Sequence, residues 1–481
     1  MSSTKPPLLE NATRDLAHFS SALSFGQIPQ DAVERIKLSL LDSIGCCVHG
    51  ATLPWTRLVR DMVEAEGGKP AASIIGGGLK TSVSQAVLVN STAGHAFELD
   101  DIHKESIVHP GSIATPVALA VAEACGGASG RDVITGMVAG YEVGARVGNA
   151  ATMSLFLRGF HPQGTSGAFV AAATAARMWG LDAPQTHHAL GIVGSQAGGL
   201  MAAQEGAMVK RFHSGRAAQS GVYSALLARR GFTGITQVLE AAYGGYLSSL
   251  SDAPRPEKLT AGLGSVWETL NVGYKPHASV TSIHTALDAL ADIMREHKLN
   301  AGDIQQVSAG LSRMTHVHCA WDYKAQGVTA AQMNLFFGLA VIALDGLAFV
   351  DQYREERLED PRILDFIGRI EACVDPEIEQ MGAAFRHAAR IKVTTRDGRA
   401  YSKEILHRRG SPENPLSRED VVYKFRHVVR SLLSEAQSEK VIKLVFELEK
   451  LPSVSELMEI LAAEPPGASL AQKKKTTRLQ T

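Results

Sequence analysis

The feature that most constrains the fold is a helical periodicity of apolar residues that continues from Asp15 to about residue 250. Apolar side chains recur there at every third or fourth position, and this spacing places them on one face of a helix. One such series consists of Val33, Ile36, Leu40 and Ile44. The segment 168–179, AFVAAATAARMW, is rich in alanine, and many of the 45 glycines stand beside alanine, so helices can approach closely. We therefore expect a large, all-helical domain.

Regular charges separate this pattern from that of a membrane bundle. Asp132, Glu142 and Arg146 interrupt the apolar periodicity. The longest apolar run, from Leu335 to Leu344, is well short of the ~20 residues that a membrane-spanning helix needs. The first residues, MSSTKPPLLENATRDLAHF, contain no apolar signal-type stretch and do not have the composition of a transit peptide. We expect a cytoplasmic protein that has no membrane partner.

Composition and charge restrict the function further. Residues of the AVILMFWYC set make up 45% of the chain and charged residues 20%, which is the balance of a globular protein with a sizeable core. With 481 residues, the chain is long enough for about three domains or for two large ones. The 48 Lys and Arg residues nearly match the 49 Asp and Glu residues, so no positive field attracts nucleic acid. Any anionic ligand must be bound by local charge.

The cysteines argue against several metal and redox functions. The chain has five of them, at Cys46, Cys47, Cys125, Cys319 and Cys373. The number is odd, and neither a C-x-x-C pair nor a short Cys/His cluster of zinc spacing is present. We expect no disulfide framework, no structural zinc and no iron–sulfur cluster.

The pattern changes after about residue 270. The segment 304–311, IQQVSAGL, alternates weakly, and the segment 389–405, ARIKVTTRDGRAYSKEI, reads as two strands. Asp397-Gly398 between them is a dipeptide favoured in a two-residue hairpin turn. Helical stretches at 279–295 and 330–344 lie between the strands. We expect an inserted α+β domain here.

The sequence therefore predicts a mainly α protein, with a large all-helical domain and a smaller inserted α+β lid domain. Its expected parts are a first helical portion at 8–272, the lid at 273–411, C-terminal helices at 412–463 that pack on the helical domain, and a disordered tail at 464–481. The C-terminal helices would begin after Ser417, which with Glu419-Asp420 forms a typical helix start. The tail is polar, basic and without periodicity.

The segment 95–116, HAFELDDIHKESIVHPGSIATP, is the strongest candidate for a functional site. Acid–base groups are dense in it although the surrounding chain is apolar, namely Glu98, Asp100, Asp101, His103 and His109. Burial and neighbouring charge shift the pKa of such groups towards neutrality. The structural alternative is a helix end at which Asp100 and Asp101 cap backbone groups while His103 faces solvent. Metal binding by Asp101, His103 and His109 is not predicted, since no H-E-x-x-H or comparable signature is present.

Further candidates lie at helix starts and at the domain junction. His161 precedes a glycine-containing turn and the alanine-rich helix, an order that favours a small carboxylate at the helix N-terminus, or simply a capped helix start. Lys210 belongs to the cationic run Lys210, Arg211 and His213, whose alternative is a solvated helix face. Lys275 and His277 stand where the chain enters the α+β domain, and pockets often form at such junctions.

A histidine pair follows the first strand expected in the α+β domain. His316 and His318 alternate, so in an extended chain both would face the same side. The alternative for this pair is a strand end with two solvated imidazoles. We treat His318 as a candidate substrate-binding residue.

In their order along the chain, these segments resemble the MmgE/PrpD family, which includes 2-methylcitrate dehydratase, cis-aconitate decarboxylase and an iminodisuccinate epimerase. The resemblance covers residues 10–462. It rests on the segment 95–101, HAFELDD, with His109-Pro110, on the turn 160–162, FHP, on Lys210, and on the segment 275–277, KPH.

The resemblance implies a catalytic cleft between a helical domain and a lid, in a homodimer that needs no cofactor. By similarity, the catalytic residues are His109, His161, Lys210 and His277, and the substrate-binding residues are Asp100, Asp101, His103, Lys275 and His318. A reaction that needs an acid and a base must bring them within reach of adjacent substrate atoms. We therefore expect His161 and His277 to converge across one cleft.

The residue pattern combines features of several branches of the family. Ile102-His103 follows the acidic pair where dehydratase-like members have a Thr-Trp pair, whereas His277 has no match in fungal decarboxylase-like members. The leading hypothesis is a lyase that dehydrates or hydrates a 2-methylcitrate- or citrate-like polycarboxylate. The alternatives are a cis-aconitate-type decarboxylase that forms itaconate, an iminodisuccinate-type epimerase, and a non-catalytic scaffold.

Overall fold

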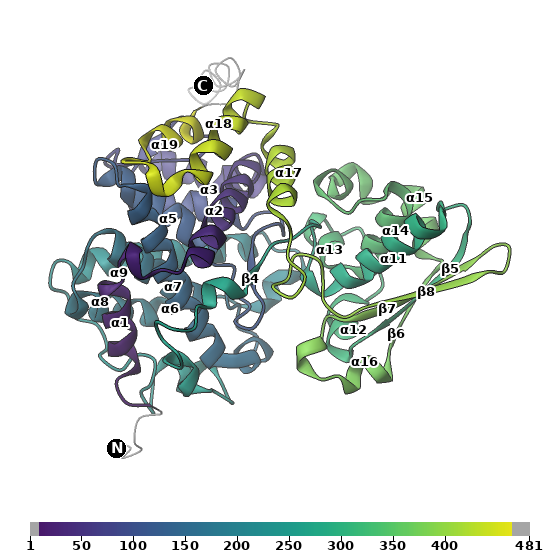
Figure 1. Cartoon of the computed structure of the whole chain (residues 1–481), viewed down its shortest axis with the longest axis horizontal. Helices are drawn as coiled ribbons and strands as arrows, with labels where there is room; N and C mark the ends of the chain where they lie inside the picture. Colours follow the sequence, from purple (N-terminus) through teal and green to yellow (C-terminus); the bar gives the residue numbers. More distant parts are fainter. Residues whose placement is uncertain (1–8, 464–481) are drawn as a thin grey trace, which may run out of the picture.

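The computed structural model describes residues 9–463, most of which are helical, so the expectation of a mainly α protein is confirmed. Figure 1 shows the larger, helical part on the left. Its helices are α1 (Ala12–Ala22), α2 (Gln30–Ala51), α3 (Pro54–Glu66), α4 (Val83–Gly94), α5 (Gly111–Ala124), α6 (Gly130–Leu157), α7 (Ser166–Met178), α8 (Ala183–Val193), α9 (Val209–Ala228) and α10 (Tyr246–Leu250). The disordered tail expected at 464–481 lies outside the described residues.

Two short strand pairs accompany these helices, so the expectation that this part contains only helices is wrong. Strand β1 (Ala72–Ser73) pairs with β2 (Lys80–Thr81), and β3 (Ile102–His103) pairs with β4 (Val272–Gly273), both antiparallel. The second pair matters for the site, because it fixes the segment after Asp101 beside the segment that leads to Lys275.

Close packing of α6 against α7 depends on glycines at four-residue spacing. A Cβ atom on Gly140 would lie 2.0 Å from Thr174 Oγ1, and one on Gly144 would lie 2.0 Å from Val170 Cγ2. Such distances are not possible between real atoms, so a larger residue at either position would push the helices apart. The many glycines beside alanines thus allow the close helix contacts that the sequence predicts.

The smaller part, on the right of Figure 1, combines a sheet with helices. The sheet has the order β6-β5-β7-β8, in which β5 and β6 are parallel and the other neighbours antiparallel. The strands are β5 (Ile304–Leu311), β6 (Ile370–Val374), β7 (Ala389–Thr395) and β8 (Ala400–Ile405). The helices are α11 (His284–His297), α12 (Arg313–Cys319), α13 (Val328–Met333), α14 (Leu335–Asp345), α15 (Pro361–Ile367) and α16 (Pro376–Gln380).

The hairpin expected around Asp397-Gly398 is present, but its loop is longer than expected. The Thr395 N–H donates to the Arg399 carbonyl at 2.8 Å, so three residues form the loop. Gly398 has φ of 87°, in the left-handed region that a glycine tolerates, as the residue after a turn of this kind requires. Along β7 the buried side alternates as predicted, with Ile391 and Val393 fully buried.

The segment that carries His316 and His318 is helical, and the expectation of an extended chain there is wrong. Ser312 caps α12, because its Oγ accepts a hydrogen bond from the Thr315 N–H at 3.2 Å. Residues two apart on a helix do not share a face. His318 consequently turns towards the helical part, where its Nε2 lies 3.0 Å from Gln204 Oε1.

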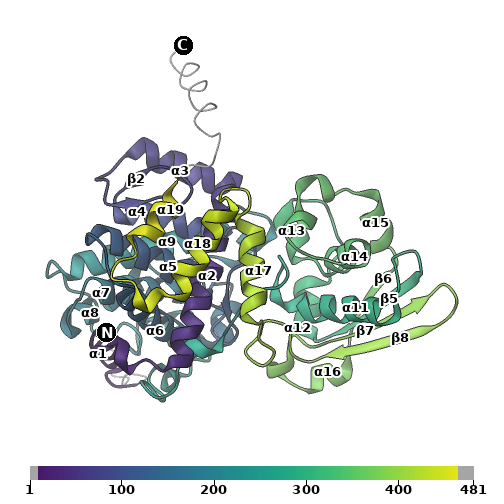
Figure 2. The same cartoon turned by 45° about the horizontal axis from the view of Figure 1, so that its top comes forward.

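The C-terminal helices return to the helical part, as Figures 1 and 2 show. They are α17 (Arg418–Val429), α18 (Glu435–Phe446) and α19 (Ser455–Ala462). Ser417 caps α17 in a capping box with Asp420, as its sequence predicts. Helix α17 packs closely on α2, since a Cβ atom on Gly45 would lie 3.0 Å from Val428 Cγ2.

Between residues 9 and 463, no helix combines the length and the apolar character needed to cross a bilayer. All five cysteines lie within this range and carry free thiols.

Candidate active site

The ends of several helices meet at a cleft between the helical part and the α+β part. The helical part contributes the loop after α4, the start of α5, the turn before α7 and the first turn of α9. The segment after β4 and residues of the α+β part complete its wall. Its polar lining consists of Glu98, Lys104, His109, His161, Gln204, Lys210, Lys275, Thr281, Ser282, His318, Arg386, His387 and Arg408.

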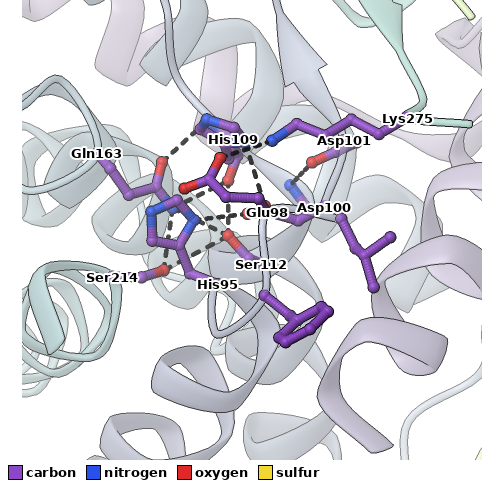
Figure 3. A network of polar contacts seen from close by, with 12 residues as sticks. His95, Glu98, Asp100, Asp101, His109, Ser112, Gln163, Ser214 and Lys275 are labelled. Carbon is purple, nitrogen blue, oxygen red and sulfur yellow. Dashed lines mark hydrogen bonds and ion pairs between the residues drawn. The ribbon is translucent and has the colours of Figure 1, made fainter. Parts of the chain in front are cut away.

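Glu98 is the centre of the charge network in this cleft, and Figure 3 shows it together with Lys275. Lys210 forms an ion pair with Glu98 Oε1, to which Arg211 Nη1 also donates at 2.6 Å. Lys275 Nζ donates to the second oxygen, Oε2, at 3.0 Å. Glu98 has φ of 53°, a conformation uncommon for residues other than glycine, so the chain is held in an unfavourable backbone state to place this carboxylate.

Burial and charge determine the protonation states of this network. Burial alone would raise the pKa of Glu98, but Lys210, Lys275 and Arg211 hold it well below its usual value, so the carboxylate is ionised. Burial lowers the pKa of Lys210 to about 8, although Glu98 opposes this shift. The alternative of a solvated helix face is excluded, because Lys210, Arg211 and His213 are buried.

A second network joins His95, Asp100 and His109. Asp100 Oδ2 lies 2.7 Å from His95 Nδ1, and Asp100 Oδ1 lies 3.3 Å from His109 Nδ1. Asp100 is fully buried, which would raise its pKa, but the two imidazoles hold the pKa well below the usual value. Asp100 does not line the cleft, whereas His109 does.

These three residues could also hold a metal ion. One ligand atom from each of His95, Asp100 and His109 lies within 4.8 Å of the others. The 2.7 Å contact between His95 and Asp100 is the distance of a hydrogen bond, which satisfies both atoms without an ion. The group differs from the set Asp101, His103 and His109 considered from sequence.

The His109 backbone is fixed by a buried amide (Figure 3). The Gln163 side chain accepts from the His109 N–H at 2.8 Å and donates to the His109 carbonyl at 3.1 Å. Gln163 Nε2 also lies 2.9 Å from both Ser112 Oγ and Ser214 Oγ. The starts of α5, α7 and α9 are thereby joined behind His109.

His161 lines the cleft and is paired with a second imidazole. Its Nδ1 lies 2.9 Å from Nδ1 of His213, so one ring donates to the other. Burial and the nearby cations lower the pKa of His161 well below its usual value, so the ring is neutral at pH 7. The N–H groups of Gly164 and Thr165 both donate to the His161 carbonyl. This turn therefore positions His161, and these two N–H groups are not free for an anion.

Two of the predicted substrate-binding residues have other contacts. Asp101 accepts from the Gly111 N–H at 2.9 Å, at the start of α5, and from Tyr141 Oη at 2.7 Å. His103 Nε2 lies 2.9 Å from Glu268 Oε2. Neither residue lines the cleft. These contacts favour the capping alternative for Asp101, whereas His103 is buried rather than facing solvent.

His277 is close to the cleft in sequence but does not line it. Its Nε2 lies 2.9 Å from Asp288 Oδ1, and its ring packs edge-on against His284, with 5.1 Å between centroids. Lys275, two residues earlier, does line the cleft. The structure thus brings together His109, His161, Lys210, Lys275 and His318, whereas His277 is not among the residues that line this cleft.

Several cleft residues were not expected from the sequence. Glu98 was noted in its segment, but its role as the partner of three cations could not be seen. Arg386, His387 and Arg408 come from the α+β part, close to strands β7 and β8. Nothing in the local sequence marked these three residues as site candidates, because basic residues beside surface strands are common.

The cleft is strongly cationic. Among the described residues that line it, Glu98 is the one carboxylate, against five basic side chains, namely Lys104, Lys210, Lys275, Arg386 and Arg408. Three imidazoles besides His109 add hydrogen-bonding capacity. A buried cleft that combines cations with paired imidazoles is typical of an enzyme that acts on a small polyanion.

Comparison with known proteins identifies the family. The sequence matches the MmgE/PrpD N-terminal domain over residues 14–258 and the MmgE/PrpD C-terminal domain over residues 277–448. The chain therefore belongs to the MmgE/PrpD family, as its motifs predict.

Curated relatives cover nearly the whole chain. Cis-aconitate decarboxylase from Aspergillus terreus is 31% identical over 469 residues, which is 93% of this chain and 95% of the relative. A cis-aconitate decarboxylase-like protein from Aspergillus oryzae is 30% identical over 94% of this chain and 98% of its own. Cis-aconitate decarboxylase from Homo sapiens is 26% identical over 95% of this chain and 96% of its own.

Proposed function

We propose that the protein is a decarboxylase of a cis-aconitate-type unsaturated tricarboxylate, releasing CO₂ and forming itaconate without a cofactor. The observation that carries the proposal is the cleft, where five basic side chains and one carboxylate surround paired imidazoles. Two of the relatives named above are cis-aconitate decarboxylases and the third is a cis-aconitate decarboxylase-like protein, which supports a lyase. They favour the alternative derived from the sequence over its leading hypothesis, dehydration of a citrate-like acid.

The charge of the cleft suits a substrate with three carboxylates. Cations in a site with little water interact with anions far more strongly than they do in solution. Lys210 and Lys275 approach from the helical part and the junction, and Arg386 and Arg408 from the α+β part. A trianion that contacts both sides would be held in one orientation.

The chemical step requires few groups. The bond between a methylene carbon and its terminal carboxylate breaks, and CO₂ leaves. The electron pair forms a new double bond to the central carbon, and the former double bond becomes a carbanion next to the other terminal carboxylate. A proton then adds to that carbon and completes itaconate, so the enzyme must stabilise the carbanion and supply one proton.

Lys210 is the residue best suited to supply the proton. With a pKa of about 8, its ammonium group is charged at pH 7 and gives up a proton readily. The neutral His161 ring, paired with His213, is suited to hydrogen-bonding the substrate and to carrying protons to the site. His109, held by Asp100 and Gln163, faces the same cleft.

The α+β part is proposed to act as a lid. Its residues form one wall of the cleft, and closing it over the substrate would exclude water. His277 lies at this junction and remains a proposed catalytic residue, which closure would have to bring to the substrate. A homodimer remains a further proposal, for which sedimentation analysis is the direct measurement.

A proton NMR time course tests the function. The purified protein is incubated separately with cis-aconitate, citrate, 2-methylcitrate and an iminodisuccinate mixture, and released CO₂ is measured in parallel. We expect itaconate signals from cis-aconitate with one CO₂ released per itaconate. Interconversion of citrate or 2-methylcitrate with its olefin, without release of CO₂, would instead favour the dehydratase. Stereochemical exchange of iminodisuccinate would favour the epimerase, and no change in any substrate would favour the scaffold.

A further inference from the structure

The cations of the cleft differ in whether a carboxylate already neutralises them. Lys210 and Lys275 share the single charge of Glu98 with Arg211, which does not itself line the cleft. Arg386 and Arg408, which belong to the α+β part, have no ion pair within 4.0 Å to any residue in the range 9–463. The two arginines are therefore the cations most available to an incoming anion.

Arg408 is buried and incompletely bonded. It is 3% exposed, and burial lowers its pKa to about 10. Its Nη1 donates to the Tyr274 carbonyl at 3.3 Å, but its buried Nη2 makes no hydrogen bond to the described residues. A buried guanidinium group with an unused donor is energetically costly unless a ligand completes it.

Arg386, like Arg408, is held by backbone carbonyls and is incompletely hydrogen-bonded. Its Nη2 donates to the Lys104 carbonyl at 2.7 Å and its Nη1 to the Ala383 carbonyl at 3.2 Å, which fixes the guanidinium plane. Its buried Nε is without a partner in the described part of the chain, as is Nδ1 of the neighbouring His387. All these groups line the same cleft.

The acids near these two arginines are engaged elsewhere. Glu413 lies 3.7 Å from Lys104, and its side chain is 41% exposed. Asp288 binds His277 and also accepts from the Arg409 backbone N–H at 3.3 Å. Glu105 forms an ion pair with Lys258. None of these three carboxylates lines the cleft.

We propose that Arg386 and Arg408 form a carboxylate subsite, separate from the Glu98 network, that binds one terminal carboxylate of the substrate. This inference rests on the proposed function and specifies how it selects its substrate. A tricarboxylate can contact both the Lys210–Lys275 side and the arginine subsite, whereas a shorter dicarboxylate leaves the arginines without a partner. The subsite would therefore discriminate tricarboxylates from dicarboxylates, because unpaired buried donors penalise the smaller ligand.

Binding of two unreactive ligands tests the subsite directly. Tricarballylate is a saturated tricarboxylate, and methylsuccinate is the same molecule without one terminal carboxylate. We would measure both dissociation constants by isothermal titration calorimetry for the wild type, Arg408→Gln, Arg386→Gln and Arg409→Gln. Arg409 is the matched control, because it is adjacent in sequence but pairs with Asp420 at the surface. The wild type should bind tricarballylate at least ~10-fold more tightly than methylsuccinate, as expected for a charge-assisted bidentate contact.

Arg408→Gln and Arg386→Gln should each reduce this preference to less than about threefold by weakening tricarballylate alone, and Arg409→Gln should retain it. Circular dichroism shows whether each variant is folded, and if Arg408→Gln is not, Arg386→Gln decides. An unchanged preference in the folded arginine variants, or equal weakening of both ligands, would overturn the subsite. If the wild type discriminates but forms no itaconate, the proposed function fails while the subsite stands.

Discussion

The acid–base behaviour of Lys210 should be visible in the pH dependence of catalysis. Burial lowers its pKa from 10.5 to about 8, so the ammonium form is present below that pH and lost above it. A proton donor must be protonated, and kcat/KM reports the free enzyme. We predict that kcat/KM for cis-aconitate falls above pH 8 by about tenfold per pH unit. A profile that stays flat to pH 9.5 would contradict this role.

Substitution of Lys210 separates proton donation from binding. Lys210→Arg keeps a positive charge opposite Glu98 but cannot release a proton at neutral pH. We expect kcat to fall by at least ~10² while KM changes much less. Arg216→Lys on the same helix is the control and should leave both constants near those of the wild type. Wild-type kcat in Lys210→Arg would show that the proton comes from another group.

Asp100 should act through the imidazoles that it holds. Asp100→Asn preserves the shape of the side chain but removes the charge that faces His95 and His109. We expect kcat to fall by about 10²–10³ with a retained fold, because the ring nitrogens lose their fixed orientation. Steady-state kinetics and circular dichroism check this, with Asp132→Asn at the exposed start of α6 as the control. An active Asp100→Asn enzyme would refute the positioning role.

The site could be predicted in part from residue types in short motifs. His109, His161, Lys210 and Lys275 were candidates and do line one cleft. Burial could not be predicted from the local sequence. A solvated helix face was therefore an open alternative for Lys210, whereas the structure buries this lysine against Glu98. Local sequence also cannot show which of two adjacent acids faces inward, so Asp100 and Asp101 were treated alike.

At the scale of elements, α17 is attached to the site by one buried lysine. Lys424 Nζ lies 2.7 Å from Asp42 Oδ1 on α2 and donates to the Leu99 carbonyl next to Asp100. Burial would lower the pKa of Lys424, but Asp42 raises it, whereas burial raises the pKa of Asp42 itself although Lys424 opposes that shift. The C-terminal helix thereby fixes the backbone that presents Glu98 and Asp100.

Removing this lysine should destabilise the fold strongly. Lys424→Met leaves Asp42 buried and without its partner, and we expect the free energy of unfolding to fall by about 3–5 kcal/mol. Urea unfolding measures this, with Lys440→Met as the control, since Lys440 pairs with Glu456 at the surface and should contribute less than about 1 kcal/mol. Equal effects of the two substitutions would contradict the proposed attachment of α17.

Elements were predictable where local signals are strong. The periodicity of α2, the capping box of α17 and the alternation of β7 were all sufficient to place those elements. Helix α12 was missed because seven residues are too few to show a period, and its cap, Ser312, follows a strand directly. Helices α13 and α14 were expected as one, but Asn334 caps the second and separates them.

For the whole molecule, the expectation of a cofactor-independent enzyme leads to a clear experiment. The His95, Asp100 and His109 group is the described cluster that could hold a metal; His95 and Asp100 are hydrogen-bonded, whereas Asp100 Oδ1 and His109 Nδ1 lie 3.3 Å apart without a hydrogen bond. We predict that dialysis against EDTA leaves kcat unchanged. Loss of activity that Fe²⁺ or Mg²⁺ restores would identify this group as metal ligands.

The mainly α architecture could be predicted from periodicity, and the α+β part from the change of pattern after residue 270. The order of strands in the sheet could not, because β6 pairs with β5 in parallel through a long connection that leaves no local signal. The cleft depends on contacts between segments far apart in sequence, such as Arg386 with Lys104, and these become visible only in three dimensions.

The most direct test of decarboxylation with protonation at carbon is the turnover of cis-aconitate in D₂O, followed by NMR. The donor exchanges its proton with solvent before it reacts, so the mechanism predicts itaconate with a single deuterium at its saturated methylene carbon, added to one face. Lys210→Arg should form this product far more slowly. Formation of citrate or isocitrate without loss of CO₂, or of itaconate without deuterium, would contradict the account.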